Sequence, residues 1–205
     1  MTHSPFAPAF QKPAPADFDL HDLLRHRWSP RAFAADALSD AELSQMLEAA
    51  RWAPSAFNEQ PWSFLVATRQ RTADFDKLLS CLTPGNQAWA AQAAGLAITV
   101  ARRELSSKPQ PNRTAQYDLG QAVAHFSFQA TALGCVVHQM AGLDLEKARA
   151  LCGIPEGHDA VTAMAFGKPG DSAALPDGVR QKDAAPRVRK PLRDFVFGAD
   201  WGRAL

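Results

Sequence analysis

Apolar residues recur along this chain with the two spacings that distinguish helices from strands. The firmest helix is predicted to follow Ser39, where the spacing i, i+3, i+4, i+7 is filled by Leu43, Met46, Leu47 and Ala50. Ser39 and Glu42 have the spacing of a capping box, in which the hydroxyl accepts from a first-turn amide and the carboxylate accepts from the cap amide. Pro54 ends this run, because the residue before a proline avoids helical backbone angles.

The rest of the pattern predicts short strands and further helices. Apolar runs predict strands over 63–68, 95–102, 136–140 and 160–167. Helices are predicted over 17–27, 75–82, a short stretch around Trp89, 117–133 and 145–152, whereas 106–113 and 173–186 are predicted to be loops. Because helices outnumber strands and no Asn-Gly hairpin turn is present, we expect an α+β fold with a small sheet sandwiched by helices.

Composition and charge narrow the functional classes. The chain has 205 residues, 46% of them hydrophobic, and its 22 Lys and Arg residues nearly balance 21 Asp and Glu residues. These values predict one globular domain, and the net charge of +1 argues against a nucleic-acid partner. We expect no secretory signal and no membrane span, since the longest apolar run is 95–101. Three widely spaced cysteines without a CxxC pair favour the reducing cytoplasm.

Several common catalytic motifs are missing from the sequence. It contains no GxGxxG loop, no P-loop, no GxSxG and no HExxH, and its six histidines lack metal-ligand spacing. We therefore expect no metal site and no side-chain nucleophile. If the protein is an enzyme, its reactive group is a cofactor that is held without those loops.

Two polar segments are candidates for binding a ligand. Residues 27–33 (RWSPRAF) place two guanidiniums and a hydroxyl within five positions, a set that suits a phosphate, although a solvated basic loop would have the same composition. Residues 50–62 (ARWAPSAFNEQPW) contain two prolines that would hold a polar loop rigidly against a ligand. The alternative is a helix end followed by a turn.

These segments, taken in order, resemble the nitroreductase family of flavoproteins. The pattern RxSxRxF at 27–33 is followed by a capped helix and then by EAARWAPSAFNEQPW at 48–62. The likeness covers about residues 20–198 and continues through GNQAW at 85–89, GCVVHQMAG at 134–142, and the pair Arg187 and Arg189. It implies a nitroreductase-like sandwich, with a small, mostly antiparallel sheet flanked by helices, in an intertwined homodimer that binds FMN at its interface.

The resemblance also implies a division of the chain and a set of site residues. Prolines among alanines predict by themselves an extended arm at 1–17. With the resemblance, this arm precedes a single FMN-binding domain at 18–198 and a tail at 199–205. By the family's pattern, FMN would be bound by Arg27, Trp28, Ser29, Arg31, Pro54, Ser55, Ala56, Asn58, Asn86, Met140, Ala141, Gly142, Arg187 and Arg189. Of these, the residues between Pro54 and Asn58 would reach the flavin of the other subunit. Phe57 and Trp89 are candidates for stacking on a substrate, with core packing as the alternative.

The activity implied by the resemblance is flavin-mediated electron transfer. Two electrons would pass from NADH or NADPH through N5 of FMN to a nitroaromatic, a quinone or a similar small acceptor. Donor and acceptor would use the same flavin face in turn, which is a ping-pong mechanism. The alternative is a flavin-binding module for storage, sensing or partner contact, without significant turnover. Four residues depart from the family's pattern: Trp28, Ala56, Trp89 and Ala141. These departures put nicotinamide and substrate preference in question more than flavin binding.

The chemistry of FMN agrees with these residues. Its phosphate is dianionic, so several arginines suit it in a chain that is otherwise nearly neutral. A fixed cation such as Arg31 beside N1 and O2 would stabilise the negative charge that reduction places there. His138 is interpreted as a hydrogen-bonded core or rim histidine, and Cys135 and Cys152 as small buried residues. The arm and residues 192–197 are expected to embrace the partner subunit.

Overall fold

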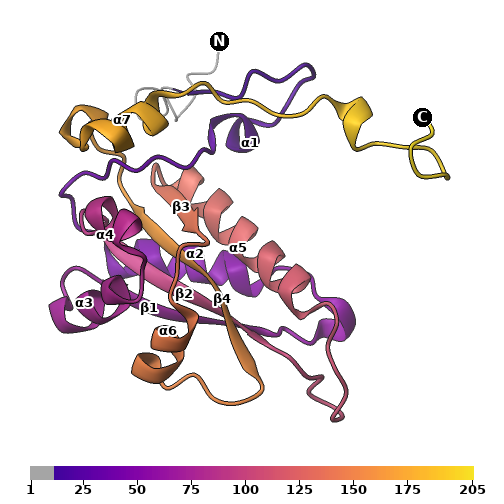
Figure 1. Cartoon of the computed structure of the whole chain (residues 1–205), viewed down its shortest axis with the longest axis horizontal. Coiled ribbons are helices and arrows are strands. Elements are labelled where there is room, and N and C mark those ends of the chain that lie inside the picture. The colour runs from indigo at the N-terminus through magenta and orange to yellow at the C-terminus, as the bar shows by residue number, and fades with distance from the viewer. Residues whose placement is uncertain (1–11) are drawn as a thin grey trace.

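Four strands form one antiparallel sheet at the centre of the computed structural model, which describes residues 12–205 (Figure 1). Their order in the sheet is β1-β2-β4-β3. Their bounds are β1 (Trp62–Thr68), β2 (Gly95–Arg102), β3 (Val136–Met140) and β4 (His158–Gly167). Each pair of neighbouring strands is antiparallel. The prediction of an α+β fold with a small, mostly antiparallel sheet is therefore confirmed.

Helices and short 3-10 turns surround the sheet (Figure 1). In residues 12–205 the α-helices are α1 (Asp22–His26), α2 (Asp40–Arg51), α3 (Thr72–Ser80), α4 (Pro84–Ala90), α5 (Ala115–Ala132), α6 (Leu145–Cys152) and α7 (Asp177–Ala184). The 3-10 turns are η1 (Ala56–Asn58), η2 (Ser172–Ala174) and η3 (Leu192–Asp194). The predicted strands, and the helices predicted over 75–82, 117–133 and 145–152, are found close to their expected bounds.

The two faces of the sheet bury two separate groups of side chains. On β2, the residues that pack with α3, α4 and α6 are Leu96, Ile98 and Val100. Those that pack with α2 and α5 are Ala97 and Ala101. This alternation is the period of two that a strand imposes on its side chains. The small alanines leave room for the long helix α5 to pack close to the sheet.

Helix α2 begins as the sequence predicts. The Ser39 hydroxyl accepts from the Glu42 amide at 3.2 Å, and the Glu42 carboxylate accepts from the Ser39 amide at 3.0 Å. Lys168, which directly follows β4, donates from Nζ to the same carboxylate at 2.7 Å. The cap therefore fixes the position of α2 relative to the sheet as well as the geometry of its first turn.

Two of the predicted elements are wrong. The helix predicted over 17–27 is limited to α1, because most of its apolar stripe stays exposed among residues 12–205; Phe18 is 71% and Leu24 43% exposed. The stretch 173–186, predicted to be a loop, contains α7. The residue that α7 buries is a carboxylate, Asp183, so the sequence carries no apolar repeat that would indicate a helix.

Residues 12–27 and the segment directly after α7 run side by side above the sheet (Figure 1). Lys12 Nζ donates to the carbonyl oxygen of Asp183 and, at 2.7 Å, to that of Ala185, while Arg187 donates to the Lys12 carbonyl at 2.7 Å. Most of the predicted arm, residues 1–11, lies outside the described residues, and the domain boundaries stay predictions. Within the described part of the chain, no helix is long and apolar enough to cross a membrane.

Candidate functional site

Three arginines converge where residues 12–27 meet the segment after α7. Arg27 directly follows α1, whereas Arg187 and Arg189 lie in the extended segment after α7. Arg187 is held by backbone carbonyls: Nη1 donates to Lys12 at 2.7 Å and to Arg25 at 3.0 Å, and Nη2 donates to Arg27 at 2.9 Å. These bonds hold the C-terminal segment against the loop after α1. We refer to Arg27, Arg187 and Arg189 as the arginine cluster.

The arginine cluster lines a cavity of about 180 Å³ with strongly basic walls. Three further basic side chains face it, and they are Lys12, Arg31 and Lys182. Asp183 is the acidic residue among its described lining residues, and Trp28 and Ser29 also contribute to the wall. The excess of positive charge makes this cavity a candidate site for an anion.

Charges within the cluster repel one another. Burial, and next the charge of Arg189, lower the pKa of Arg27; burial, and next the charges of Arg27 and Arg189, lower the pKa of Arg187. Arginine stays protonated in spite of such shifts, so the repulsion persists. A phosphate placed among the three guanidiniums would relieve it through charge-assisted hydrogen bonds. The Ser29 hydroxyl lies 3.4 Å from Arg27 Nη1 and has a proton to donate to such a group.

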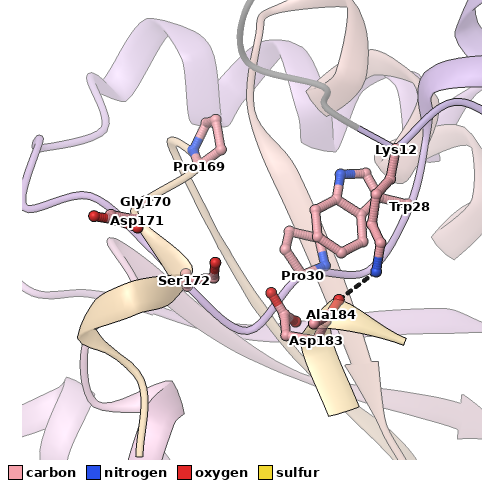
Figure 2. A pocket seen from close by; sticks show the side chains of 10 residues that line it. Lys12, Trp28, Pro30, Pro169, Gly170, Asp171, Ser172, Asp183 and Ala184 are labelled. Atoms are coloured by element: carbon pink, nitrogen blue, oxygen red, sulfur yellow. Dashed lines mark hydrogen bonds between the residues drawn. The ribbon is translucent and has the colours of Figure 1, made fainter. Parts of the chain in front are cut away.

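A second cavity of about 470 Å³ adjoins the first (Figure 2). The two share Lys12, Trp28 and Asp183 as lining residues. The Lys12 ammonium lies 5.0 Å from the centre of the Trp28 ring, and residues 169–172 form the opposite wall (Figure 2). Trp28 therefore belongs to the walls of both cavities.

Arg31 connects the basic cavity to the core. Its guanidinium lies 3.8 Å from Asp183 Oδ1 and 6.0 Å from the centre of the Trp89 ring. Trp89 in turn lies 4.6 Å from the His138 ring, and His138 Nδ1 is 2.9 Å from the Ser29 carbonyl oxygen. A carbonyl can only accept, so His138 Nδ1 carries a proton. Burial, and next the charge of Arg31, lower the pKa of His138 and favour its neutral ring.

A second group of the predicted site residues lies between α4 and the end of β3. Asn86 Nδ2 donates to the Gly142 carbonyl at 3.1 Å, and the Thr83 amide donates to the same oxygen at 3.0 Å. A Cβ at Gly142 would lie 2.5 Å from Asn86 Nδ2 and 2.6 Å from the Thr83 hydroxyl, so a side chain there would displace at least one of them. Met140 is buried and Ala141 exposed. The turn therefore presents bare backbone beside the Asn86 side chain.

The third group is the loop between α2 and β1. Phe57, Asn58 and Gln60 have φ values of 54°, 56° and 46°, a region that residues with a Cβ rarely adopt. Such strain persists only where the surrounding structure imposes it. Pro54 and Asn58 are exposed, and Phe57 is 91% exposed. The loop thus has a constrained backbone and projects an aromatic ring and an amide into solvent.

Two carboxylates hold this loop in its shape. Asp118 of α5, only 1% exposed, accepts from the Ala56 amide at 3.2 Å. Glu59 accepts from Arg102 of β2 at 2.9 Å and from the Ser106 amide at 2.7 Å. These contacts run to α5 and β2 rather than to the arginine cluster.

The structure therefore brings two of the three predicted groups together within one chain. His138 lies two residues before Met140 and contacts the Ser29 carbonyl, so the end of β3 and the arginine loop are neighbours. The loop 54–58 is supported separately. Of the two interpretations of Trp89, the structure shows core packing, because its side chain is 2% exposed.

Comparison with known proteins identifies the family. The sequence model of the nitroreductase family matches residues 24–168, which is more than half of the chain. The chain belongs to the nitroreductase family. A solved structure described as an oxidoreductase containing FMN is 31% identical, with a TM-score of 0.86 over 92% of this chain and 96% of that one.

Two further proteins are similar to shorter parts of the chain. An FMN-dependent nitroreductase from Clostridium difficile is 21% identical, with a TM-score of 0.62 over 73% of this chain and 87% of that one. An uncharacterized 15.4 kDa protein from Mycolicibacterium smegmatis is 33% identical over 134 residues, or 64% of this chain and 86% of that protein. The family match ends before α7, so Arg187 and Arg189 lie beyond the matched residues.

Sequence reasoning missed part of the cavity wall. Lys12, Lys182 and Asp183 line it, yet none belongs to a recognisable motif. Lys12 stands in a proline-rich segment, and the other two lie on the unpredicted helix α7. Among residues 12–205, no group of three or more His, Cys, Asp or Glu side chains could hold a metal ion.

Proposed function

We propose that this chain is an FMN-dependent oxidoreductase, which takes two electrons from NADH or NADPH and delivers them to a small acceptor such as a nitroaromatic or a quinone. The observation that carries the proposal is the arginine cluster, whose mutually repelling guanidiniums surround a cavity large enough for a phosphate. The related oxidoreductase that covers 92% of this chain contains FMN, which supports the same cofactor here.

The residues present fit the parts of FMN. The arginine cluster and Ser29 would hold the phosphate, while Arg31 would face the pyrimidine edge of the ring. The backbone at Ala141 and Gly142, with Asn86, would face the other polar edge; the bare backbone at Gly142 supports this fit. Bound FMN supplies two-electron chemistry at N5. The positive charge of Arg31 would stabilise negative charge on the pyrimidine edge.

Nicotinamide donor and acceptor would occupy the same flavin face in turn. The chain has no GxGxxG loop for a separate dinucleotide site, which supports this shared use and the ping-pong mechanism that follows from it. Phe57 would stack on planar substrates, because its ring is exposed and projects from a loop of defined backbone conformation. Acceptors with flat, conjugated rings are therefore the proposed substrate class.

A homodimer with shared sites is part of the proposal. Large apolar side chains lie exposed in the single chain, among them Trp52, Tyr117, Leu192 and Phe195. A partner subunit would cover them, and its Pro54, Ser55, Ala56 and Asn58 would complete the flavin site. The three cysteines are free, which supports a reducing, cytoplasmic location.

Anaerobic titration of the purified holo-protein with NADH and NADPH tests the proposal. Either donor is expected to bleach the flavin absorbance, and a nitroaromatic, a quinone or an enal should restore it. Heat-released cofactor should be FMN. If dithionite bleaches the flavin but neither nicotinamide does, the protein is a flavin-binding module without significant turnover. Recovery of FAD, or no flavin after reconstitution, would contradict the assignment of the arginine cluster to an FMN phosphate.

A further inference from the structure

Asp183 is a buried carboxylate in the wall of the basic cavity, and the proposed function gives it no task. It is 4% exposed, and its Oδ1 accepts from the Arg31 amide at 2.8 Å. The Arg31 guanidinium lies 3.8 Å from the same oxygen. Figure 2 shows Asp183 at the end of α7, beside Pro30. Helix α7 thus brings a carboxylate to a loop that lies 152 residues away in the sequence.

A carboxylate at this place is unfavourable for two reasons. A buried charge is destabilising unless a partner satisfies it, and a negative charge weakens the attraction between the surrounding guanidiniums and an anion. The Lys12 ammonium bonds the backbone carbonyl of Asp183 rather than its carboxylate. The hydrogen bond and the ion pair of the carboxylate are both directed at Arg31.

We propose that Asp183 is a positioning residue, which fixes the backbone and the guanidinium of Arg31 for contact with the flavin ring. This inference rests on the proposed function, in which Arg31 faces the pyrimidine edge. The amide bond fixes the loop 29–31 from the α7 side, while His138 contacts the Ser29 carbonyl from the β3 side. Because the pair carries little net charge, Asp183 also sets how strongly Arg31 favours reduced flavin.

Amide hydrogen exchange on the flavin-free protein tests the contact itself. Asp183→Ala should raise the exchange rate of the Arg31 amide by about tenfold, since a charge-assisted hydrogen bond is lost. Asp177→Ala is the matched control, because Asp177 lies on the same helix with its side chain 83% exposed. Equal protection of the Arg31 amide in both variants would overturn the inference.

The midpoint potential of bound flavin separates positioning from a merely structural role. Asp183→Asn keeps the size of the side chain and an acceptor for the Arg31 amide but removes the negative charge. The positive charge of Arg31 is then less compensated and stabilises reduced flavin more, so the midpoint potential of the bound flavin should become more positive. Asp183→Ala should weaken FMN binding by about tenfold, measured by quenching of flavin fluorescence. An unchanged potential in Asp183→Asn, equal to that of Asp177→Asn, would overturn the inference even if the alanine variant does not fold.

Arginine variants distinguish the failure of this inference from the failure of the proposed function. If Arg27→Ala and Arg31→Ala both bind FMN like the parent, the proposed flavin site is wrong. If both bind FMN weakly while the Asp183 variants match the Asp177 controls, the flavin site stands and the role of Asp183 is wrong.

Discussion

The guanidinium of Arg187 donates a hydrogen bond of 2.9 Å to the carbonyl oxygen of Arg27, across a sequence separation of 160 residues. Arg187 therefore has two roles at the cavity. Its charge belongs to the basic wall, and its hydrogen bonds link the C-terminal segment to the loop after α1. Because the segment after α7 supplies two of the six basic side chains in the wall, the cavity forms only when this segment is in place against residues 12–31.

Loss of one arginine from the cluster should weaken cofactor binding more than folding. Arg27→Ala or Arg189→Ala removes one charge-assisted contact to the proposed phosphate, which lowers FMN affinity by about ten- to a hundredfold. Flavin fluorescence during titration of the apo-protein measures this loss, and thermal unfolding of the apo-protein measures the effect on the fold. Arg193→Ala is the control, since that side chain is 85% exposed in η3. Parent-like flavin retention in both cluster variants would identify these arginines as a solvated surface.

A methyl group at Gly142 should displace Asn86. The added Cβ would lie 2.5 Å from Asn86 Nδ2 and 2.6 Å from the Thr83 hydroxyl, so Gly142→Ala must move one or both. We expect FMN affinity to fall by about tenfold, since a displaced Asn86 side chain would lose its proposed hydrogen bond to the flavin ring. Gly85→Ala, on the same helix as Asn86 with open space around it, should bind FMN like the parent. Equal affinities for the two variants would remove Asn86 and Gly142 from the flavin site.

Elements with local signals were predictable from the sequence. The capping box at Ser39 and the apolar repeat that follows it both predict α2. Asp144 and Gly153 mark the two ends of α6. The stripe that begins at Phe18 predicts a longer helix than α1, because a sequence pattern does not reveal whether a face finds a core to pack against. Helix α7 has a polar pattern without an apolar stripe, because the residue that it buries is the carboxylate Asp183, and the sequence therefore did not predict it.

The candidate site was predictable only in part. The order of motifs gave Arg27, Arg31 and Arg187 as candidates, and the structure brings them to one cavity. The burial of Asp183 depends on a contact over 152 residues, for which no local signal exists. The positive φ of Phe57 is imposed by neighbouring elements, so the sequence alone did not indicate a strained loop.

Replacement of Glu42 should make the free energy of unfolding less dependent on pH between about 4.5 and 2. The hydrogen bond from Lys168, and next those from Ser39, lower the pKa of Glu42 from 4.5 to about 2. Its contribution to folding is therefore complete above pH 4.5 and is lost as the pH falls toward 2. Glu42→Gln keeps a cap acceptor but loses the ion pair, so it should be less stable at neutral pH by about 1 kcal/mol.

Urea unfolding of parent and Glu42→Gln at several pH values measures this difference. The gap between them should close in acid, because the protonated carboxyl and the amide are then both uncharged. Glu42→Asp is a useful comparison, since the shorter side chain keeps the charge but shortens the reach to Lys168. A gap that stays constant down to pH 2 would show that the Glu42 charge does not stabilise the fold.

Two defective chains should restore activity when they pair, if the flavin sites are shared across a homodimer. Arg31→Ala damages the pocket of its own chain, whereas Asn58→Ala damages the loop that the chain offers to its partner. In a mixed dimer both defects fall in one pocket, and the other pocket is intact. Heterodimers purified through two different tags should therefore have about half the activity of the parent dimer. Both homodimers must first be shown to be inactive, and the chains must be co-expressed, because subunit exchange can be slow.

The backbone at Asn58 requires its own control. Its φ of 56° favours glycine over alanine, so Asn58→Gly removes the amide side chain without adding backbone strain. Both Asn58 variants should complement Arg31→Ala if the side chain contacts flavin across the interface. If only the alanine variant is inactive alone, strain rather than the lost amide is the cause, and Asn58 is not a flavin ligand. Light scattering that finds a monomer with full flavin occupancy and activity would contradict the shared site altogether, since a single chain would then supply every flavin contact.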